Sequence, residues 1–446
     1  MTEATIASQS DPSAAMRPRS AVSSWVGFAG LAGLIGWLLI ARHYGMNGPN
    51  AALTSVVACG LPMVLWSVLV DKVHRNPTTG IDWDRQPRSL ADIRDISATK
   101  LAGLWCTWAV LAFVYAILRY YWQGNYLFAI TLFAWLVVPL VLLSIPYVLW
   151  LDRRLEEPKD NCWAFGHWLL GRDGPHNLDA IWSHWRTWAV KGFFTAFMVS
   201  IVPPNFVAVV DTPMKQLLAS PVEAAAFGIA FLYMVDVHLA TVGYVMTMRP
   251  LDAHIREANP YGMAWVAALI CYPPFILMGA GGPLSYEVGT APWHQWMAGH
   301  AWLLWIWAGL LVALTAVYAW ATVAFGLRFS NLTHRGIITH GPYAFSRHPA
   351  YVAKNLFWWL SVLPFLPASG SIMDAVRNTV LLGVVSGVYY WRAKTEEQHL
   401  LADPDYRRYW QWAQDHAIIP RLFKHFNGQE MPLVTLQPKR SAIGKP

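Results

Sequence analysis

The chain carries an arginine and a histidine directly before a proline, close to its C-terminal end. They belong to the run Gly-Pro-Tyr-Ala-Phe-Ser-Arg-His-Pro-Ala-Tyr, which spans residues 341–351. Proline is favoured in the first turn of a helix, where its missing N–H would have no partner in any case, so Pro349 is predicted to begin a helix. A helix N-terminus carries partial positive charge and free N–H groups. With Arg347 and His348 beside it, this one is predicted to bind a carboxylate or a phosphate.

A second group of charged residues stands at the end of the next apolar run. Arg392 and Glu396 are four residues apart on a predicted helix and therefore share a face. Glu397 points elsewhere and is expected to be free for a ligand. Because the two groups lie on consecutive apolar runs joined by a short turn, they place cations and carboxylates at one face of a membrane. That combination suits a ligand with a zwitterionic amino-acid group and a ribose diol.

The order of these motifs resembles that of a known enzyme family. It runs from GPY and RHPxY through a helical hairpin to R-x-x-x-E-E-x-x-L and an aromatic and basic tail, Tyr406-Arg407-Arg408-Tyr409. This order is similar to the isoprenylcysteine carboxyl methyltransferase family and its phospholipid methyltransferase relatives, over roughly residues 335–423. The resemblance implies a module at residues 326–425 that binds S-adenosylmethionine. The residues that it assigns to the cofactor pocket are Arg347, His348, Tyr351, Glu396 and Glu397, and we predict that Tyr343 and Arg392 bind the cofactor with them. Relatives often have glycine where this chain has Ala353, whose methyl group would tighten helix packing or narrow the cofactor tunnel.

The resemblance implies an integral membrane methyltransferase. It would move a methyl group from S-adenosylmethionine to a lipid, an isoprenoid-linked compound or another membrane-partitioning acceptor. In-line attack on the sulfonium methyl group needs no metal, and holding donor and acceptor in line while excluding water can supply much of the rate. The cofactor would enter from the cytosol and the acceptor sideways from the bilayer. A nitrogen nucleophile would need a base, whereas a carboxylate or thiolate would not, so the catalytic residues and the methylated atom stay open.

Two other classes of membrane protein are alternatives to a methyltransferase. A membrane reductase of the sterol-reductase type also has about ten spans and a related pocket for NADPH, but its 2′-phosphate would prefer extra arginines to paired glutamates. A transporter or lipid-binding protein with a degenerate module is a further alternative, although no internal repeat supports a transporter. The net charge of +7 could suggest nucleic acid, but no recognition pattern accompanies it, and a membrane protein with basic cytoplasmic loops explains the same charge.

The motifs must be positioned by membrane-spanning helices. Of the 446 residues, 55% are hydrophobic and 13% charged, which leaves too few charges to cover a soluble particle of this size. The predicted fold is therefore all-α, a polytopic membrane protein with about ten transmembrane helices. The apolar runs of spanning or near-spanning length lie at about 21–41, 51–70, 101–118, 127–149, 189–210, 222–246, 262–279, 302–325, 349–366 and 375–391.

The basic residues predict which side each loop faces. If the N-terminus is cytoplasmic, 28 of the 33 lysines and arginines fall in cytoplasmic segments or at their edge, as the positive-inside rule requires. We therefore expect cytoplasmic tails at residues 1–20 and 426–446, in a bacterial inner membrane. Lys354, near a predicted helix start, is expected to snorkel to the cytoplasmic interface. The oligomeric state is open.

Residues 21–325 have no assigned role and are a possible substrate chamber. Within them Asp236 and His238 lie in the middle or latter half of a predicted span, where ionisable groups are costly and usually have a role. The alternative is a structural pairing with Arg249 or with a backbone carbonyl. The four cysteines are far apart in sequence and predict neither a disulfide framework nor a zinc site. They are Cys59, Cys106, Cys162 and Cys271.

Overall fold

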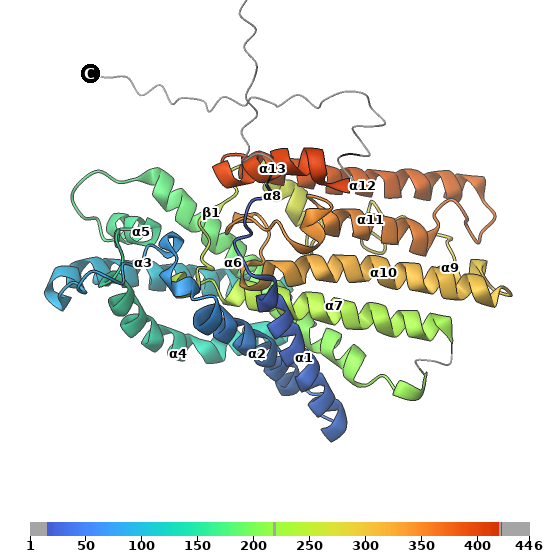
Figure 1. Cartoon of the computed structure of the whole chain (residues 1–446), viewed down its shortest axis with the longest axis horizontal. Helices are drawn as coiled ribbons and strands as arrows, with labels where there is room; N and C mark the ends of the chain where they lie inside the picture. The colour runs from blue at the N-terminus through green and yellow to red at the C-terminus, as the bar shows by residue number, and fades with distance from the viewer. Residues whose placement is uncertain (1–15, 217–219, 419–420, 422–446) are drawn as a thin grey trace, which may run out of the picture.

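The computed structural model describes residues 16–216, 220–418 and 421, and it is mostly helical (Figure 1). Two short strands occur in this described part of the chain, β1 (Glu257–Ala258) and β2 (Thr333–His334). They pair antiparallel, with Glu257 opposite His334. The prediction of a helical fold is confirmed.

Eight helices in the described ranges are long and apolar enough to cross a membrane. They are α1 (Ser24–Tyr44), α2 (Pro49–Leu65, with a π-helical turn to Val70), α3 (Leu90–Ile117), α4 (Tyr126–Asp152), α6 (Leu178–Val210), α7 (Pro221–Val245), α10 (Ala301–Phe325) and α12 (Ile372–Leu400). Several expose large apolar side chains, such as Trp135, Val138 and Leu143 on α4. Extended apolar surface of this kind fits hydrocarbon rather than water. The helices indicate an integral membrane protein, while the predicted count of about ten is not confirmed.

Two of the predicted spans are represented by short helices. α8 (Gly262–Leu269) covers only the first part of the run at 262–279, which then turns through Pro273 and Pro274. α11 (Pro349–Val362) ends before Leu363, whose backbone is left-handed with a φ of 49°. At 1.5 Å per residue, α11 rises about 21 Å, against roughly 30 Å of hydrocarbon. Prolines inside or just after each run cannot continue the helical hydrogen bonding, and this explains both breaks.

Local signals set the starts of the helices around the motifs. α11 begins at Pro349, as predicted. The Ser371 side chain caps α12, and the Asp403 carboxylate caps α13 (Pro404–His416) by accepting hydrogen bonds from backbone N–H groups. Such a cap contributes about 1 kcal/mol. The remaining α-helices of the described residues are α5 (Asn161–Leu169) and α9 (Trp293–Trp296).

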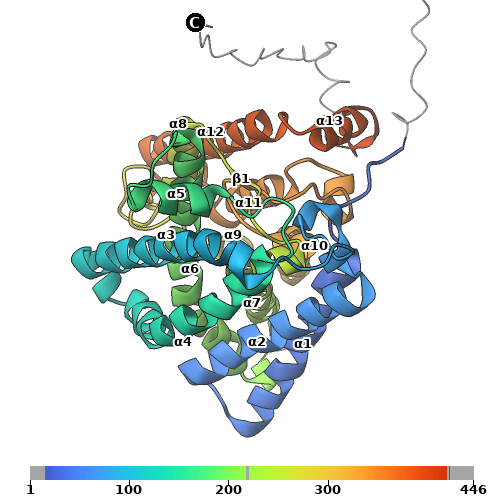
Figure 2. The same cartoon turned by 90° about the vertical axis from the view of Figure 1, so that its left-hand side faces the viewer.

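The helices around the motifs form one packed row. α7, α10, α11 and α12 lie side by side in that order, each in contact with the next (Figure 1). α7 also packs on α2 and α6, and its buried Met234 and Leu239 join Leu34 and Phe206 in one apolar core. Figure 2 shows α12 and α13 along one edge of the molecule and α2 and α4 along the opposite edge. The two motif helices are therefore fixed through α10 to the centre of the protein.

The described residues before α1 contact the loop before α11 and helix α13. Ala21 N donates to Ile337 O over 2.8 Å, and Thr339 Oγ1 donates to Pro18 O over 2.7 Å. The guanidinium carbon of Arg17 lies 5.9 Å from the centroid of the Trp412 ring. The two ends of the described chain therefore lie together. Residues 1–15 and 426–446 of the predicted tails are outside the described residues.

Candidate functional site

The motif residues surround one cavity of about 170 Å³. A single water needs roughly 10–15 Å³ of such space, so this cavity has room for more than a single water. Its walls come from α10, α11, α12, α13 and the loop between α10 and α11. Six of the seven predicted cofactor residues line it, namely Tyr343, Arg347, His348, Tyr351, Arg392 and Glu396. The structure thus brings two sequence motifs together as the hairpin prediction required.

Glu397 is the exception, and the prediction that it is free for a ligand is wrong. Its Oε1 lies 3.1 Å from Arg347 Nε and 3.0 Å from His348 Nε2, and its Oε2 lies 3.1 Å from Lys394 Nζ. Glu397 does point away from the Arg392 face, but the segment before α11 occupies the space there. A buried carboxylate with three basic partners is already satisfied. Glu397 therefore holds Arg347 and His348 in place and does not line the cavity.

Glu396 faces the cavity and joins α11 to α12. Tyr351 OH donates a hydrogen bond to Glu396 Oε1, and Arg392 Nε lies 3.4 Å from the same oxygen. Arg392 Nη2 also donates to Asn331 Oδ1 over 2.6 Å. The prediction that Arg392 and Glu396 share a face is confirmed. Within the described residues these contacts all use Oε1, which leaves the second carboxylate oxygen of Glu396 for a ligand.

Arg347 lines the cavity and carries one unused donor. Its Nη1 is buried and has no hydrogen-bond partner in the described part of the chain. The guanidinium carbon stands 5.1 Å from the centroid of the Trp410 ring, which fixes the plane of the group. A buried unpaired donor on a charged group is costly unless a ligand satisfies it. Arg347 therefore fits the carboxylate of an amino-acid moiety.

Tyr343 and Ala353 support the site through packing. The Tyr343 ring lies 5.3 Å from that of Phe325, and its backbone carbonyl accepts a 2.8 Å hydrogen bond from Tyr409 OH. Burial raises the pKa of Tyr343 far above its usual value, so the phenol stays neutral. Ala353 is 3% exposed and does not line the cavity. Its methyl group contributes to helix packing and leaves the cavity wall unchanged.

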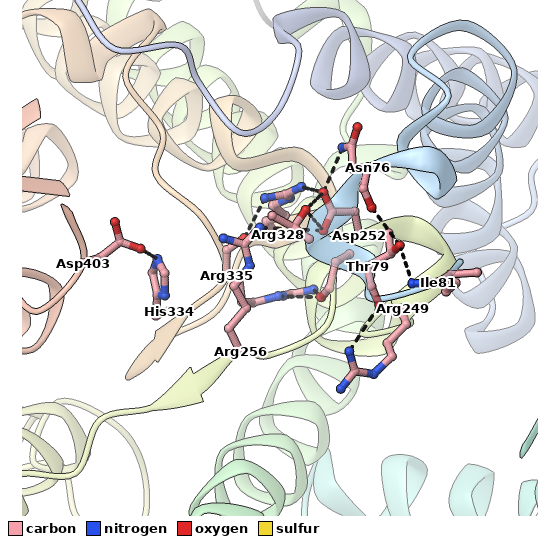
Figure 3. A network of polar contacts seen from close by, with 12 residues as sticks. Asn76, Thr79, Ile81, Arg249, Asp252, Arg256, Arg328, His334, Arg335 and Asp403 are labelled. Atoms are coloured by element: carbon pink, nitrogen blue, oxygen red, sulfur yellow. Dashed lines mark hydrogen bonds and ion pairs between the residues drawn. The ribbon is translucent and has the colours of Figure 1, made fainter. Parts of the chain in front are cut away.

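A buried arginine pair, Arg328 and Arg335, lines the cavity and forms the back wall of the site, and Figure 3 shows the polar network around the two residues. Arg328 Nη2 lies 2.6 Å from Asp252 Oδ2, and Arg328 Nη1 donates to the backbone carbonyl of Arg335. Arg335 donates to five backbone carbonyls, including those of Gly243 and Phe329 at 2.8 Å. Burial lowers the pKa of Arg335 to about 9. The hydrogen bonds of both arginines go to partners within the protein, which gives the pair a structural role.

Asp252 also joins the back wall to the loop before α3. Its carboxylate accepts hydrogen bonds from Asn76 Nδ2 at 2.9 Å and from Thr78 Oγ1 at 2.8 Å. On the other side of Figure 3, His334 Nε2 lies 3.2 Å from Asp403 Oδ2, which ties β2 to the start of α13. The cavity is thus built from segments far apart in the sequence.

Asp236 and His238 have different surroundings. His238 Nδ1 lies 2.7 Å from Met234 O and its Nε2 lies 2.7 Å from Ser55 Oγ, so it pairs inside the core, as the structural alternative expected. Asp236 does not pair with Arg249 or a carbonyl. It accepts hydrogen bonds from Tyr318 OH at 2.7 Å and from Thr322 Oγ1. Because Tyr318 and Thr322 both line the cavity, Asp236 lies directly behind its wall.

Sequence reasoning missed several lining residues, of which Lys354 is the most informative. Its Nζ lies 4.5 Å from the centroid of the Tyr318 ring and 3.5 Å from the Tyr318 hydroxyl. The expectation that it snorkels to the interface is wrong, because it extends into the cavity lining. A charge inside an apolar run was a signal for this role. Asn331, Tyr272 and Tyr389 also line the cavity, and no motif marked them.

Comparison with known proteins shows that part of the chain is similar to a protein family of unknown function. Residues 266–412 match a family described as protein of unknown function, DUF1295. The match covers α10, α11, α12 and most of α13, and so includes most of the cavity-lining residues. No curated protein and no solved structure matches the chain.

Proposed function

We propose that this protein is an integral membrane methyltransferase that uses S-adenosylmethionine and a membrane-partitioning acceptor. The observation that carries the proposal is the meeting of RHPxY and the first glutamate of the E-E pair around one cavity. Arg347 adds a buried donor that no described residue satisfies. This arrangement provides cationic and acidic groups for the two charges of an amino-acid moiety.

Each residue then has a definite task. Arg347 and His348 bind the carboxylate of the cofactor, and Glu397 orients them through its 3.1 and 3.0 Å contacts. The unused oxygen of Glu396 binds the amino group or the ribose. S-adenosylmethionine supplies an electrophilic methyl group when bound. The protein binds, orients and excludes water, which is enough for much of the rate in an in-line transfer.

The buried arginines weigh against the reductase alternative. A dinucleotide phosphate would need cationic groups with free donors. Arg328 and Arg335 line the cavity, but their hydrogen bonds go to Asp252 and to backbone carbonyls. Arg347 has a free nitrogen, and a single guanidinium beside a glutamate matches a zwitterion better than a phosphate. Cytoplasmic termini and a bacterial inner membrane belong to the same proposal, because the cofactor is cytosolic.

The test is ligand-dependent stability of the purified full chain. S-adenosylhomocysteine should raise the midpoint of thermal unfolding, since a ligand that binds only the folded state stabilises it by mass action. NADPH at the same concentration should not. Stabilisation by NADPH alone would replace this proposal with the reductase, and stabilisation by neither would leave a lipid-binding or transport protein. Comparing lipids of deletion and wild-type cells fed methyl-labelled methionine would then identify the acceptor.

A further inference from the structure

Two hydroxyl groups in the cavity wall have their protons directed away from the cavity. Tyr318 OH donates to Asp236 Oδ2 over 2.7 Å, and Thr322 Oγ1 donates to Asp236 Oδ1. Asp236 is 6% exposed and lies behind the wall that Tyr318 and Thr322 form. An ionised carboxylate can only accept hydrogen bonds, and a hydroxyl has one proton and two lone pairs. Both hydroxyls therefore present lone pairs, and no proton, to the cavity.

Lys354 supplies a donor at the same place. Its contact of 3.5 Å to Tyr318 OH is the hydrogen bond found for its ammonium group within the described ranges. The centroids of the Trp358 and Tyr389 rings each lie 5.9 Å from Nζ, and Lys354 lines the cavity. An ammonium group has three donors, so donors remain for a ligand. Its charge also offsets that of Asp236, which makes the group neutral as a whole.

We propose that Tyr318, Thr322 and Lys354, backed by Asp236, form an acceptor subsite, and that the acceptor is a lipophilic alcohol or phenol methylated on oxygen. The inference rests on the proposed function. A neutral hydroxyl group can donate its proton to Tyr318 or Thr322 and accept from Lys354. A carboxylate has no proton for the two hydroxyls, and an ammonium ion has no lone pair for Lys354 and repels its charge.

The subsite also provides a route for the proton. The acceptor oxygen forms a bond to the methyl carbon, and the bond between that carbon and sulfur breaks with its electron pair going to sulfur. The acceptor proton passes to the Tyr318 oxygen while the Tyr318 proton passes to Asp236. The products are a methyl ether, S-adenosylhomocysteine and a protonated Asp236. His348 and Lys354 are six residues apart, about 9 Å along the axis of α11, so the subsite is separate from the carboxylate-binding end.

The test uses four probes that share one alkyl chain, with the full-length protein in lipid nanodiscs. The probes are 4-nonylphenol, its methyl ether 4-nonylanisole, 4-nonylbenzoate and 4-nonylbenzylamine. Binding of each probe is measured, without cofactor, as a rise in the midpoint of thermal unfolding. The phenol should stabilise the wild type and the other three should not. Tyr318→Phe should weaken phenol binding about two- to tenfold, the effect of one hydrogen bond. The matched control is Tyr233→Phe, because this ring lies 6.0 Å from that of Tyr318 but does not line the cavity.

A second variant tests the direction of the protons. In Asp236→Asn the amide donates to one of the two hydroxyls, which can then turn its own proton into the cavity. This variant should bind 4-nonylbenzoate or 4-nonylanisole better than the wild type does, a change in selectivity that misfolding cannot produce. The inference is overturned if benzoate or benzylamine stabilises the wild type as well as the phenol, if Tyr318→Phe binds the phenol unchanged, or if none of the probes binds.

The ligand experiments distinguish failure of the proposed methyltransferase function from failure of the acceptor subsite. Phenol-selective stabilisation without any effect of S-adenosylhomocysteine would reject the methyltransferase and keep a subsite for hydroxyl groups. Stabilisation by S-adenosylhomocysteine together with benzoate selectivity would keep the methyltransferase and reject the hydroxyl acceptor. With both ligands bound, methyl-labelled S-adenosylmethionine and 4-nonylphenol should yield labelled 4-nonylanisole, and Tyr318→Phe should lower that rate.

Discussion

Arg347 Nε lies 3.1 Å from Glu397 Oε1, and the same oxygen lies 3.0 Å from His348 Nε2. One carboxylate on α12 therefore fixes both basic residues at the start of α11. Removing either partner of a buried charged pair leaves the other uncompensated. The three residues should for that reason respond to mutation as one unit.

We expect Arg347→Ala to weaken binding of S-adenosylhomocysteine at least about tenfold, because it removes a charge-assisted hydrogen bond of about 1.5–3 kcal/mol. Glu397→Gln should also weaken binding, because Arg347 and His348 lose the carboxylate that orients them. The double variant should lose little more than Arg347→Ala alone, since contacting residues are not additive. Titration calorimetry gives all three values. Arg377→Ala, near the other end of α12, is the control, and strictly additive losses would show that Glu397 contacts the ligand independently.

Asp252→Ala should be strongly destabilising. It leaves Arg328 buried without its counter-ion, a loss of about 3–5 kcal/mol for a broken buried pair. The matched control is Asp405→Ala, which breaks an exposed pair with Arg408 worth at most about 1 kcal/mol. The thermal unfolding midpoint in detergent compares the two. Equal midpoints would mean that the network in Figure 3 contributes no stability.

His254 should make stability fall with decreasing pH. Burial lowers its pKa to about 3 in the folded protein, while an unfolded histidine titrates near 6.5. Between these values the unfolded state binds more protons than the folded state, so the contribution is present above pH of about 6.5 and declines as the pH falls towards about 3. His254→Gln should flatten the fall of the unfolding midpoint between pH 7.5 and 5. His176→Gln, at an exposed position, should leave the fall unchanged.

Fusions at the two ends of the chain should report the same side of the membrane. Arg17 stacks on Trp412, and Thr339 bonds to Pro18, so the described ends lie together. A cytoplasmic reporter such as green fluorescent protein should be active at both ends, and alkaline phosphatase at neither. Phosphatase activity after Pro446 would place the cavity away from cytosolic cofactor and contradict the proposed function.

Local features around the motifs could be predicted from the sequence, whereas the count of about ten spans is not confirmed. Pro349 marked a helix start because proline suits only the first turn, and the four-residue spacing of Arg392 and Glu396 was enough to place them on one face. The runs at 262–279 and 349–366 are apolar throughout, and hydropathy registers the residues of turns and helices alike. In the structure both runs break near their prolines, so neither forms a helix long enough to be counted among the eight candidate spans of the described residues.

Tertiary contacts determine the roles of two residues that helical spacing in the sequence could not assign. Helical periodicity placed Glu397 off the Arg392 face but held no information on what packs there. Lys354 was expected at the cytoplasmic interface because it stands near a predicted helix start. As a 14-residue helix between α10 and α12, α11 instead directs Lys354 towards Tyr318. Tyr318 and Thr322 are four positions apart on α10 and therefore share one face of the helix. In the structure that face points at Asp236.

The segment that matches the DUF1295 family is not a unit that could be cut out of the chain. Residues 266–412 contain Arg328 and Arg335 but neither Asp252 nor the carbonyls of Gly243, Met246 and Ala253 that receive their hydrogen bonds. An excised segment would bury two guanidinium groups with most of their partners missing. Removal of the chain up to and including Thr78 is likewise expected to loosen the cavity wall, because Asp252 would lose the hydrogen bonds from Asn76 and Thr78.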